Sequence, residues 1–122
     1  MASKANPQPN DLLPLTPAVF HILLALADEE KHGYAIMKEV ETNSNGQFQM
    51  GPGTLYGSIK RMLELNLIEE TDERPDPAMD DQRRRYYKQT PFGVKVLKAE
   101  LQRFSDLMRV AQSKRALGRF GG

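Results

Sequence analysis

Apolar residues recur at helical spacing in several segments of the chain, and the segment from Gly51 to Glu69 shows the clearest pattern. Its apolar residues stand at i, i+4, i+7 and i+8, namely Leu55, Ile59, Met62 and Leu63. This spacing places them on one side of an α-helix, so Lys60 and Arg61 point away from that side. The pair Gly51-Pro52, as N-cap and first helical residue, predicts where the helix begins.

The polar side of this helix has the residues expected of a DNA-recognition helix. Hydroxyl groups lie near its N-terminal end, at Thr54, Tyr56 and Ser58, where the helix dipole and free amides favour a phosphate. Asn66 is a typical left-handed stop. A surface helix with a solvated polar face is the alternative interpretation.

A shorter periodic segment precedes this helix. It follows a polar turn over Asp28 to Lys31, opens at His32-Gly33-Tyr34 and continues to about Thr42. Gly33 would allow a neighbouring element to approach closely. The turn residues Asn43 to Gly46 separate the segment from the basic helix. Two helices joined by a compact turn, the second carrying cations, are typical of a helix-turn-helix.

Two further helices begin with a threonine before a proline. Thr16-Pro17 starts one that ends near Ala27, and Thr90-Pro91 starts one that ends near Lys114. The last helix has apolar residues at alternating spacings of three and four: Val94, Leu97, Leu101, Phe104, Met108 and Ala111. This heptad seam has more apolar surface than the other elements of so small a domain can cover. We therefore expect the helix to pair with a second copy of the chain. Packing entirely within the subunit is the alternative.

A hairpin is predicted between the basic helix and the last helix. Ile68 to Asp72 indicates a strand, residues 73–81 a loop, and Arg83 to Gln89 the return strand. Because the loop is acidic, we expect contact with a polyanion to come from the arginines of the stem: Arg83, Arg84 and Arg85. Cross-strand packing is the alternative role for the neighbouring Tyr86 and Tyr87.

These elements predict a mainly α fold with a two-stranded β wing, in which a winged helix-turn-helix is followed by a long C-terminal dimerisation helix. The predicted organisation has four parts: a disordered tail over residues 1–14, the winged helix-turn-helix over 15–89, the dimerisation helix over 90–115 and a flexible tail over 116–122. A chain of 122 residues suits one small domain.

Charge is distributed unevenly along the chain although the net charge is only +1. Up to Gln82 there are 6 Lys and Arg against 14 Asp and Glu, or −8, and from Arg83 onward there are 11 against 2, or +9. This asymmetry favours a basic surface that meets a polyanion. Salt bridging between the two halves is the alternative.

The composition argues against an enzyme and against a cofactor. With 0 Cys and 2 His, the chain lacks thiolate chemistry and a plausible metal-ligand set, so we expect His21 to pack in the core or an interface. Neither a Gly-rich phosphate loop nor a nucleophile beside a base is present. No apolar run approaches the roughly 20 residues of a membrane span, so we expect a cytoplasmic protein.

The order of these elements resembles the PadR family of transcriptional regulators. The resemblance covers about residues 15–97 and rests on successive short motifs: His32-Gly33-Tyr34, Gly53-Thr54-Leu55-Tyr56, Ile59-Lys60-Arg61-Met62, Leu67-Ile68, Arg84-Arg85-Tyr86-Tyr87 and Thr90-Pro91-Phe92-Gly93. It implies a homodimeric winged-helix protein, usually a repressor, that binds a palindromic operator and is released by a small molecule. The short final segment is similar to the smaller PadR subgroup, so a phenolic acid effector does not follow.

Carried over residue by residue, the resemblance implies contacts with double-stranded DNA by Tyr34, Thr54, Tyr56, Ser58, Lys60, Arg61, Arg83, Arg84 and Arg85. The family's dimer is built from the first and last helices, which implies an interface of Phe20, Leu24, Val94, Leu97, Leu101, Phe104 and Met108. The apolar surplus near this seam suggests a pocket for a small hydrophobic or aromatic effector, lined by Phe20, Leu24, Leu101 and Phe104.

The chain also departs from the family pattern. Gly57 stands where the family commonly has Pro, Gln89 stands where it commonly has an apolar residue, and the wing tip is acidic. Winged helices also serve as protein-interaction modules, which is the alternative functional class. The consecutive arginines favour DNA, because a wing that docks on a protein would not need them.

Overall fold

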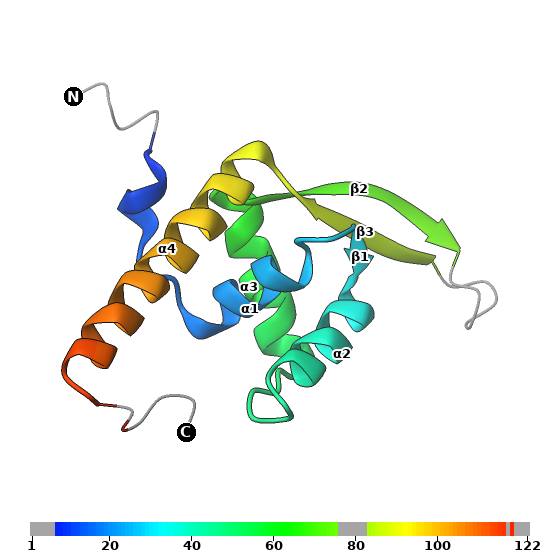
Figure 1. Cartoon of the computed structure of the whole chain (residues 1–122). Helices are drawn as coiled ribbons and strands as arrows, with labels where there is room; N and C mark the ends of the chain where they lie inside the picture. The colour runs from blue at the N-terminus through cyan, green and yellow to red at the C-terminus, as the bar shows by residue number, and fades with distance from the viewer. Residues whose placement is uncertain (1–6, 76–82, 117, 119–122) are drawn as a thin grey trace.

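The computed structural model describes residues 7–75, 83–116 and 118, and it contains helices around a small three-stranded sheet (Figure 1). In chain order its elements are η2 (Pro9–Leu12), α1 (Pro17–Ala25), β1 (Lys31–His32), α2 (Gly33–Asn43), α3 (Pro52–Glu64), β2 (Ile68–Pro75), β3 (Arg83–Gln89) and α4 (Pro91–Ser113). The predicted winged helix and the long last helix are therefore confirmed.

The predicted start signals of the helices are present as hydrogen-bonded caps. The Thr16 hydroxyl accepts from the Val19 amide at 3.3 Å, and the Thr90 hydroxyl accepts from the Gly93 amide at 2.9 Å. Each satisfies a backbone donor that a helix start leaves unpaired. At the end of α3, Asn66 has φ of 63°, which confirms the predicted left-handed stop.

The sheet has one strand more than the predicted two-stranded wing. Its order is β1-β3-β2, all antiparallel, with Lys31 opposite Tyr87 and His32 opposite Tyr86. The prediction of a polar turn up to Lys31 was wrong at that residue, because a strand of only two residues shows no alternation of polar and apolar positions. The extra strand ties the start of α2 to the wing.

The strand β2 is longer than expected and irregular. It continues past Asp72 to Pro75, so the predicted loop of residues 73–81 begins later; residues 76–81 lie outside the described residues. The register shifts between Glu70 and Glu73, which marks a β-bulge.

Part of the predicted N-terminal tail is ordered. The η2 turn lies along α4, and Leu12, Leu13 and Leu15 pack against the core. The Leu15 amide also donates to the Glu100 carboxylate at 2.9 Å. The expectation of disorder over residues 1–14 was therefore wrong from Pro9 onward, because short leucine contacts with a distant helix leave no periodic pattern in the sequence. Residues 1–6 lie outside the described residues.

A single apolar core joins α1, α2, α3, the sheet and the first half of α4. Its fully buried side chains include Ile22, Leu23, Ile36, Leu55, Met62, Leu67, Ile68 and Val96. Gly93 closes the core at the start of α4, where a Cβ would stand 3.0 Å from the carbonyl carbon of Leu67. Only glycine permits this approach of helix to backbone.

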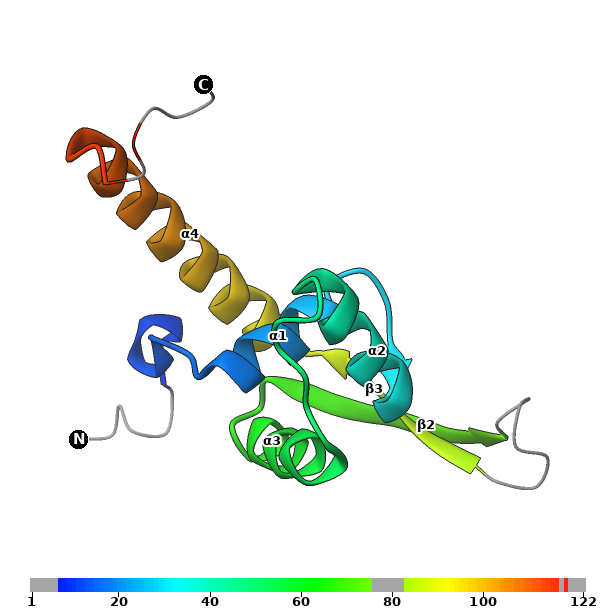
Figure 2. The same cartoon turned by 90° about the horizontal axis from the view of Figure 1, so that it is seen from below.

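The second half of α4 leaves the domain. Both views show the helix extending away from the other elements, on the side opposite the wing (Figures 1 and 2). The side chains from Leu101 onward are mostly exposed, including Phe104, Leu107 and Met108. The described chain therefore does not cover this half of the helix.

Candidate nucleic-acid interface

The outward face of α3 is open and free of large side chains along its centre. Buried apolar side chains hold the helix on the domain: Leu55, Ile59 and Met62. Helical spacing puts Gly53 and Gly57 on the opposite side, and no atom lies within 4 Å of where a Cβ would stand at either glycine. Exposed Lys60 and Arg61 flank this column. A nucleic-acid backbone or groove edge could approach the helix closely between these cations.

The polar groups of α3 favour an anion. Thr54 is exposed and Ser58 is half-buried, and both lie on the same flank of the helix as Arg61. The sequence of α3 contains one carboxylate, Glu64, at its C-terminal residue. The N-terminal part of the helix therefore presents hydroxyls, cations and the positive end of the dipole without an opposing acid.

Tyr56 lies on the other flank of α3 and also contacts α2. Its side chain is 48% exposed, and its hydroxyl and ring carbons lie against Gly33. The predicted close approach at Gly33 is confirmed, and the approaching group is a side chain expected to meet DNA. Tyr56 therefore links the position of α2 to the surface of α3.

At the start of α2, Tyr34 is 48% exposed and the Lys38 ammonium lies 5.8 Å from the centre of its ring. The side chain of His32 caps the helix by accepting from the Ala35 amide at 3.1 Å. Because this end of α2 and the flank of α3 with Tyr56 meet at Gly33, the structure brings Tyr34 and Tyr56 to neighbouring surfaces.

A buried lysine fixes the turn between α1 and α2. Lys31 donates to the Ala25 carbonyl at 2.8 Å and pairs with Asp28 at 2.6 Å and Glu39 at 3.4 Å. Burial lowers the pKa of Lys31, but the hydrogen bond to Asp28 and the charge of Glu39 outweigh it and raise the pKa above its usual value. The lysine therefore stays charged and holds α2 against the end of α1.

The segment that leads into α3 is anchored by packing. The Ser44 hydroxyl accepts from the Phe48 amide at 3.0 Å, and the His21 ring stacks on the Phe48 ring with centroids 4.8 Å apart. Nδ1 of His21 has no hydrogen-bond partner among the described residues. The predicted packing role for His21 is thus what the described contacts show.

In the wing, the structure places Arg85 beside acidic residues. Its Nε lies 3.7 Å from a carboxylate oxygen of Glu70, and Lys88 lies 3.6 Å from Glu69. Arg83 and Arg84 belong to β3, but their side chains lie outside what the structure describes. Tyr87 is buried and the Tyr86 ring meets His32 edge to face, so cross-strand packing accounts for both tyrosines.

The apolar face of α4 differs in part from the predicted seam. Leu97 is only 6% exposed and belongs to the core of its own subunit, so it is not available to a partner. The exposed apolar side chains of α4 are Val94, Leu101, Phe104, Leu107, Met108 and Val110. Leu107 and Val110 lie off the predicted heptad spacing.

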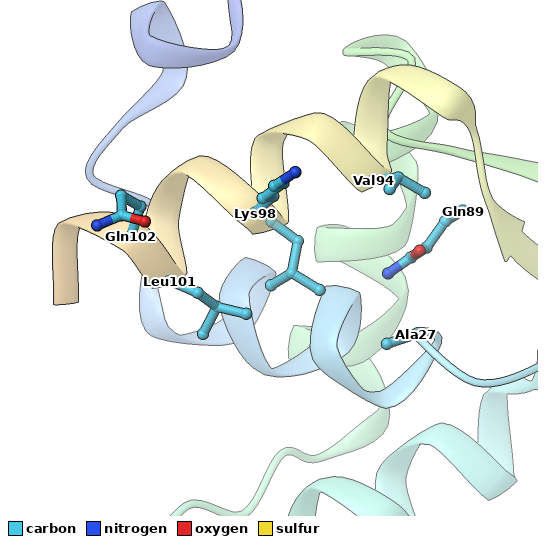
Figure 3. Close-up of a pocket in the computed structure, with 7 residues that line it drawn as sticks. Ala27, Gln89, Val94, Lys98, Leu101 and Gln102 are labelled. Carbon is cyan, nitrogen blue, oxygen red and sulfur yellow. The ribbon is translucent and has the colours of Figure 1, made fainter. Parts of the chain in front are cut away.

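Two of the residues predicted to line an effector pocket contact each other: Phe20 and Phe104 meet edge to face with ring centroids 5.1 Å apart. A groove of about 400 Å³ lies nearby (Figure 3). Its lining residues are Ala27, Gln89, Val94, Leu97, Lys98, Leu101 and Gln102. Leu101 is the predicted pocket residue that this groove includes.

Gln89 has a structural reason for its unusual polarity. Its side-chain amide donates to the Leu23 carbonyl at 2.8 Å, at the end of the groove where Val94 lies (Figure 3). That carbonyl also accepts from the Leu26 amide at 3.2 Å, so Gln89 adds a second donor at the last turn of α1. This role depends on a long-range contact that no local sequence pattern reveals.

Among the described residues, no group of His, Cys, Asp or Glu is arranged to hold a metal ion. In the same part of the chain, no helix is both long and apolar enough to cross a membrane.

Comparison with known proteins gives a family match. The model of the transcriptional regulator PadR-like family matches residues 22–99. That range begins within α1, ends within α4 and contains α2, α3 and all three strands.

Solved structures share this fold. A PadR family transcription regulator from Clostridium difficile R20291 has a TM-score of 0.67 and 26% identity, over 80% of this chain and 97% of that one. Bacillus subtilis PadR in complex with operator DNA has a TM-score of 0.62 and 18% identity, over 72% of this chain and 48% of that one.

A relative in sequence is much longer. An uncharacterized 37.1 kDa protein in transposon TN4556 of Streptomyces fradiae is 34% identical over 86 residues, or 70% of this chain. The match spans 22% of that relative, so the chain corresponds to about a fifth of its length.

Proposed function

The chain belongs to the PadR-like family of transcriptional regulators, and we propose that it is a cytoplasmic, DNA-binding repressor that acts as a homodimer. The observation that carries this proposal is the outward face of α3, where Gly53 and Gly57 leave the backbone accessible between Lys60 and Arg61. Bacillus subtilis PadR, which shares the fold, has been solved with operator DNA and supports the same role here.

In the proposed complex, each subunit lays α3 into a major groove. Lys60 and Arg61, together with Tyr34 and Tyr56, would hold phosphates, which position the protein without reading sequence. The best-placed groups for base edges are Thr54, Ser58 and Lys60. The bidentate patterns that distinguish base pairs lie in the major groove, so specificity would come from these few side chains.

The second copy of the chain would cover the exposed half of α4. Exposed apolar residues recur along α4, most of them in its second half: Val94, Leu101, Phe104, Leu107, Met108 and Val110. Phe20 and Leu24, both half-buried on α1, border this surface. A symmetric dimer would present two copies of α3, which fits a palindromic operator with half-sites about one helical turn apart.

The groove between α1 and α4 supports release by a small molecule. Apolar side chains form most of its wall, and Lys98 and Gln102 add polar groups at its edge (Figure 3). Val94 and Leu101 also belong to the proposed dimer surface, so an apolar or aromatic effector would bind where it could change the angle between subunits. Titration of planar aromatic compounds should then weaken DNA binding; unchanged affinity would count against release by such compounds.

Fluorescence anisotropy tests the DNA-binding proposal. We would compare the duplex upstream of the protein's own coding region with a scrambled duplex across a salt series. Preference of about a thousandfold with a steep salt slope would support a specific regulator. If neither this duplex nor a selected random library is preferred, the proposal fails and a protein-interaction role for the same surface gains support.

A further inference from the structure

Arg85 lies on the face of the wing that packs against the domain. Side chains alternate along a strand, so Arg85 shares a face with Tyr87 two residues away. Tyr87 is buried, and burial together with the nearby Glu70 and Tyr56 raises its pKa, while Arg85 opposes that rise. Arg85 therefore shares a face of the wing with a buried tyrosine that lies near Tyr56 of α3.

A carboxylate already occupies the neighbourhood of Arg85. Glu70, opposite Tyr87 in the register, extends diagonally so that its carboxylate oxygen lies 3.7 Å from Nε of Arg85. The β-bulge then sets Glu73 directly opposite Arg85; a regular ladder would have placed Asp72 there. The Glu70 carboxylate thus lies on the face of the wing that carries Arg85.

The ion pair is weak enough for DNA to displace. The Arg85 side chain is 63% exposed and that of Glu70 is 39% exposed. Exposed pairs of this kind contribute only about 0–1 kcal/mol. A DNA phosphate at the right position could therefore take the place of Glu70, whereas a poorly placed phosphate would gain little.

We propose that Glu70 is a specificity-determining residue, which competes with DNA phosphates for Arg85 and so weakens binding to non-specific DNA. This inference rests on the proposed DNA-binding function, and it assigns to Glu70 an effect on how well the protein distinguishes specific from non-specific DNA. Non-specific affinity comes from phosphate neutralisation by cations. An internal carboxylate that occupies Arg85 removes one such contact unless the DNA geometry favours its release.

A double-mutant cycle on a scrambled duplex tests the proposal with wild type, Glu70→Gln, Arg85→Gln and the double variant. Glu70→Gln should raise non-specific affinity by roughly threefold or more and steepen the salt slope by about 0.9, the value for one added phosphate contact. The gain should vanish in the Arg85→Gln background, because the cation that pairs with Glu70 is then missing.

Glu69→Gln is the matched control, because it makes the same charge change at the neighbouring position, where Glu69 pairs with Lys88 on the opposite face. Equal gains from Glu69→Gln and Glu70→Gln, or a gain that persists without Arg85, would overturn the proposal in favour of a bulk charge effect. No gain from Glu70→Gln would also overturn it. If the wild type binds no duplex, the proposed DNA-binding function itself is refuted. The wild-type titration alone gives this result, so it is distinct from a failure of the proposal for Glu70.

Discussion

The ring of Tyr56 lies against the backbone of Gly33, so that a Cβ at position 33 would stand 2.9 Å from Cζ of the tyrosine. This contact joins the start of α2 to the flank of α3. Because the tyrosine is also half exposed, one side chain sets the arrangement of the helix pair and contributes to the surface proposed to meet DNA.

Gly33→Ala should therefore reduce DNA affinity more than it reduces stability. The added methyl would push aside the end of a flexible side chain, which costs little in the fold, but it would move Tyr56 from its place. We expect DNA affinity to fall by roughly tenfold, equal to about 1.4 kcal/mol, in anisotropy titrations. In a Tyr56→Ala background the same change should have almost no further effect; an undiminished effect there would contradict this account.

Gly57→Ala should have opposite effects on stability and on binding. Alanine is favoured over glycine inside a helix by about 1 kcal/mol, and open space surrounds position 57. Thermal unfolding should thus shift upward, while the methyl on the outward face should weaken DNA binding. A variant that is more stable and binds DNA as well as wild type would show that DNA does not approach this part of α3.

Gly93→Ala should destabilise the fold. A Cβ there would run into the Leu67 carbonyl, which belongs to the backbone and cannot rotate away. Overpacking of this kind costs about 1–3 kcal/mol, measurable by urea unfolding. Gly57→Ala is the control, because the same substitution in an open helical position should stabilise the protein. Equal stability of the two variants would contradict the close contact between Gly93 of α4 and the backbone of Leu67, which precedes β2.

Glu100 should make stability fall in acid. It is 1% exposed and accepts hydrogen bonds from Arg103 and from the Leu15 amide, which hold its pKa below the usual value of a glutamate despite its burial. A carboxyl with a lowered folded-state pKa stabilises the fold above its unfolded pKa, and that stabilisation is lost as pH falls through the folded value.

Glu100→Gln should therefore lower the free energy of unfolding at pH 7 by about 1–3 kcal/mol and flatten its decrease below about pH 4.5. The control is Asp106→Asn, because Asp106 pairs with Arg109 on the exposed half of α4. That change should alter stability little. Equal acid sensitivity of wild type and Glu100→Gln would contradict the role assigned to Glu100.

The helices were predictable from sequence because their signals are local. Thr16-Pro17, Thr90-Pro91 and the periodic core residues of α3 each specify a boundary or a face within a few positions. The sequence did not predict β1, because its two residues pair with β3, which is far along the chain. Sheet pairing of that kind depends on tertiary context, which a short segment cannot encode.

The candidate site was predictable to a similar extent. Helical periodicity predicted which residues of α3 face outward. The glycine at position 33 predicted that a neighbouring element approaches closely there. The pairing of Arg85 with Glu70 did not, because it depends on register and on a bulge in β2. The contacts of Lys31, Gln89 and Glu100 were missed for the same reason: each satisfies a polar group that is distant in sequence or buried only by folding.

The salt dependence of DNA binding by Lys60→Ala tests most directly whether the outward face of α3 meets DNA. Lys95→Ala, a change of equal charge at an exposed position of α4, is the control. Lys60→Ala should weaken binding to the upstream duplex and reduce the salt slope by about 0.9, as expected for one lost phosphate contact, whereas Lys95→Ala should change neither. Unchanged affinity and salt slope in Lys60→Ala would contradict the account.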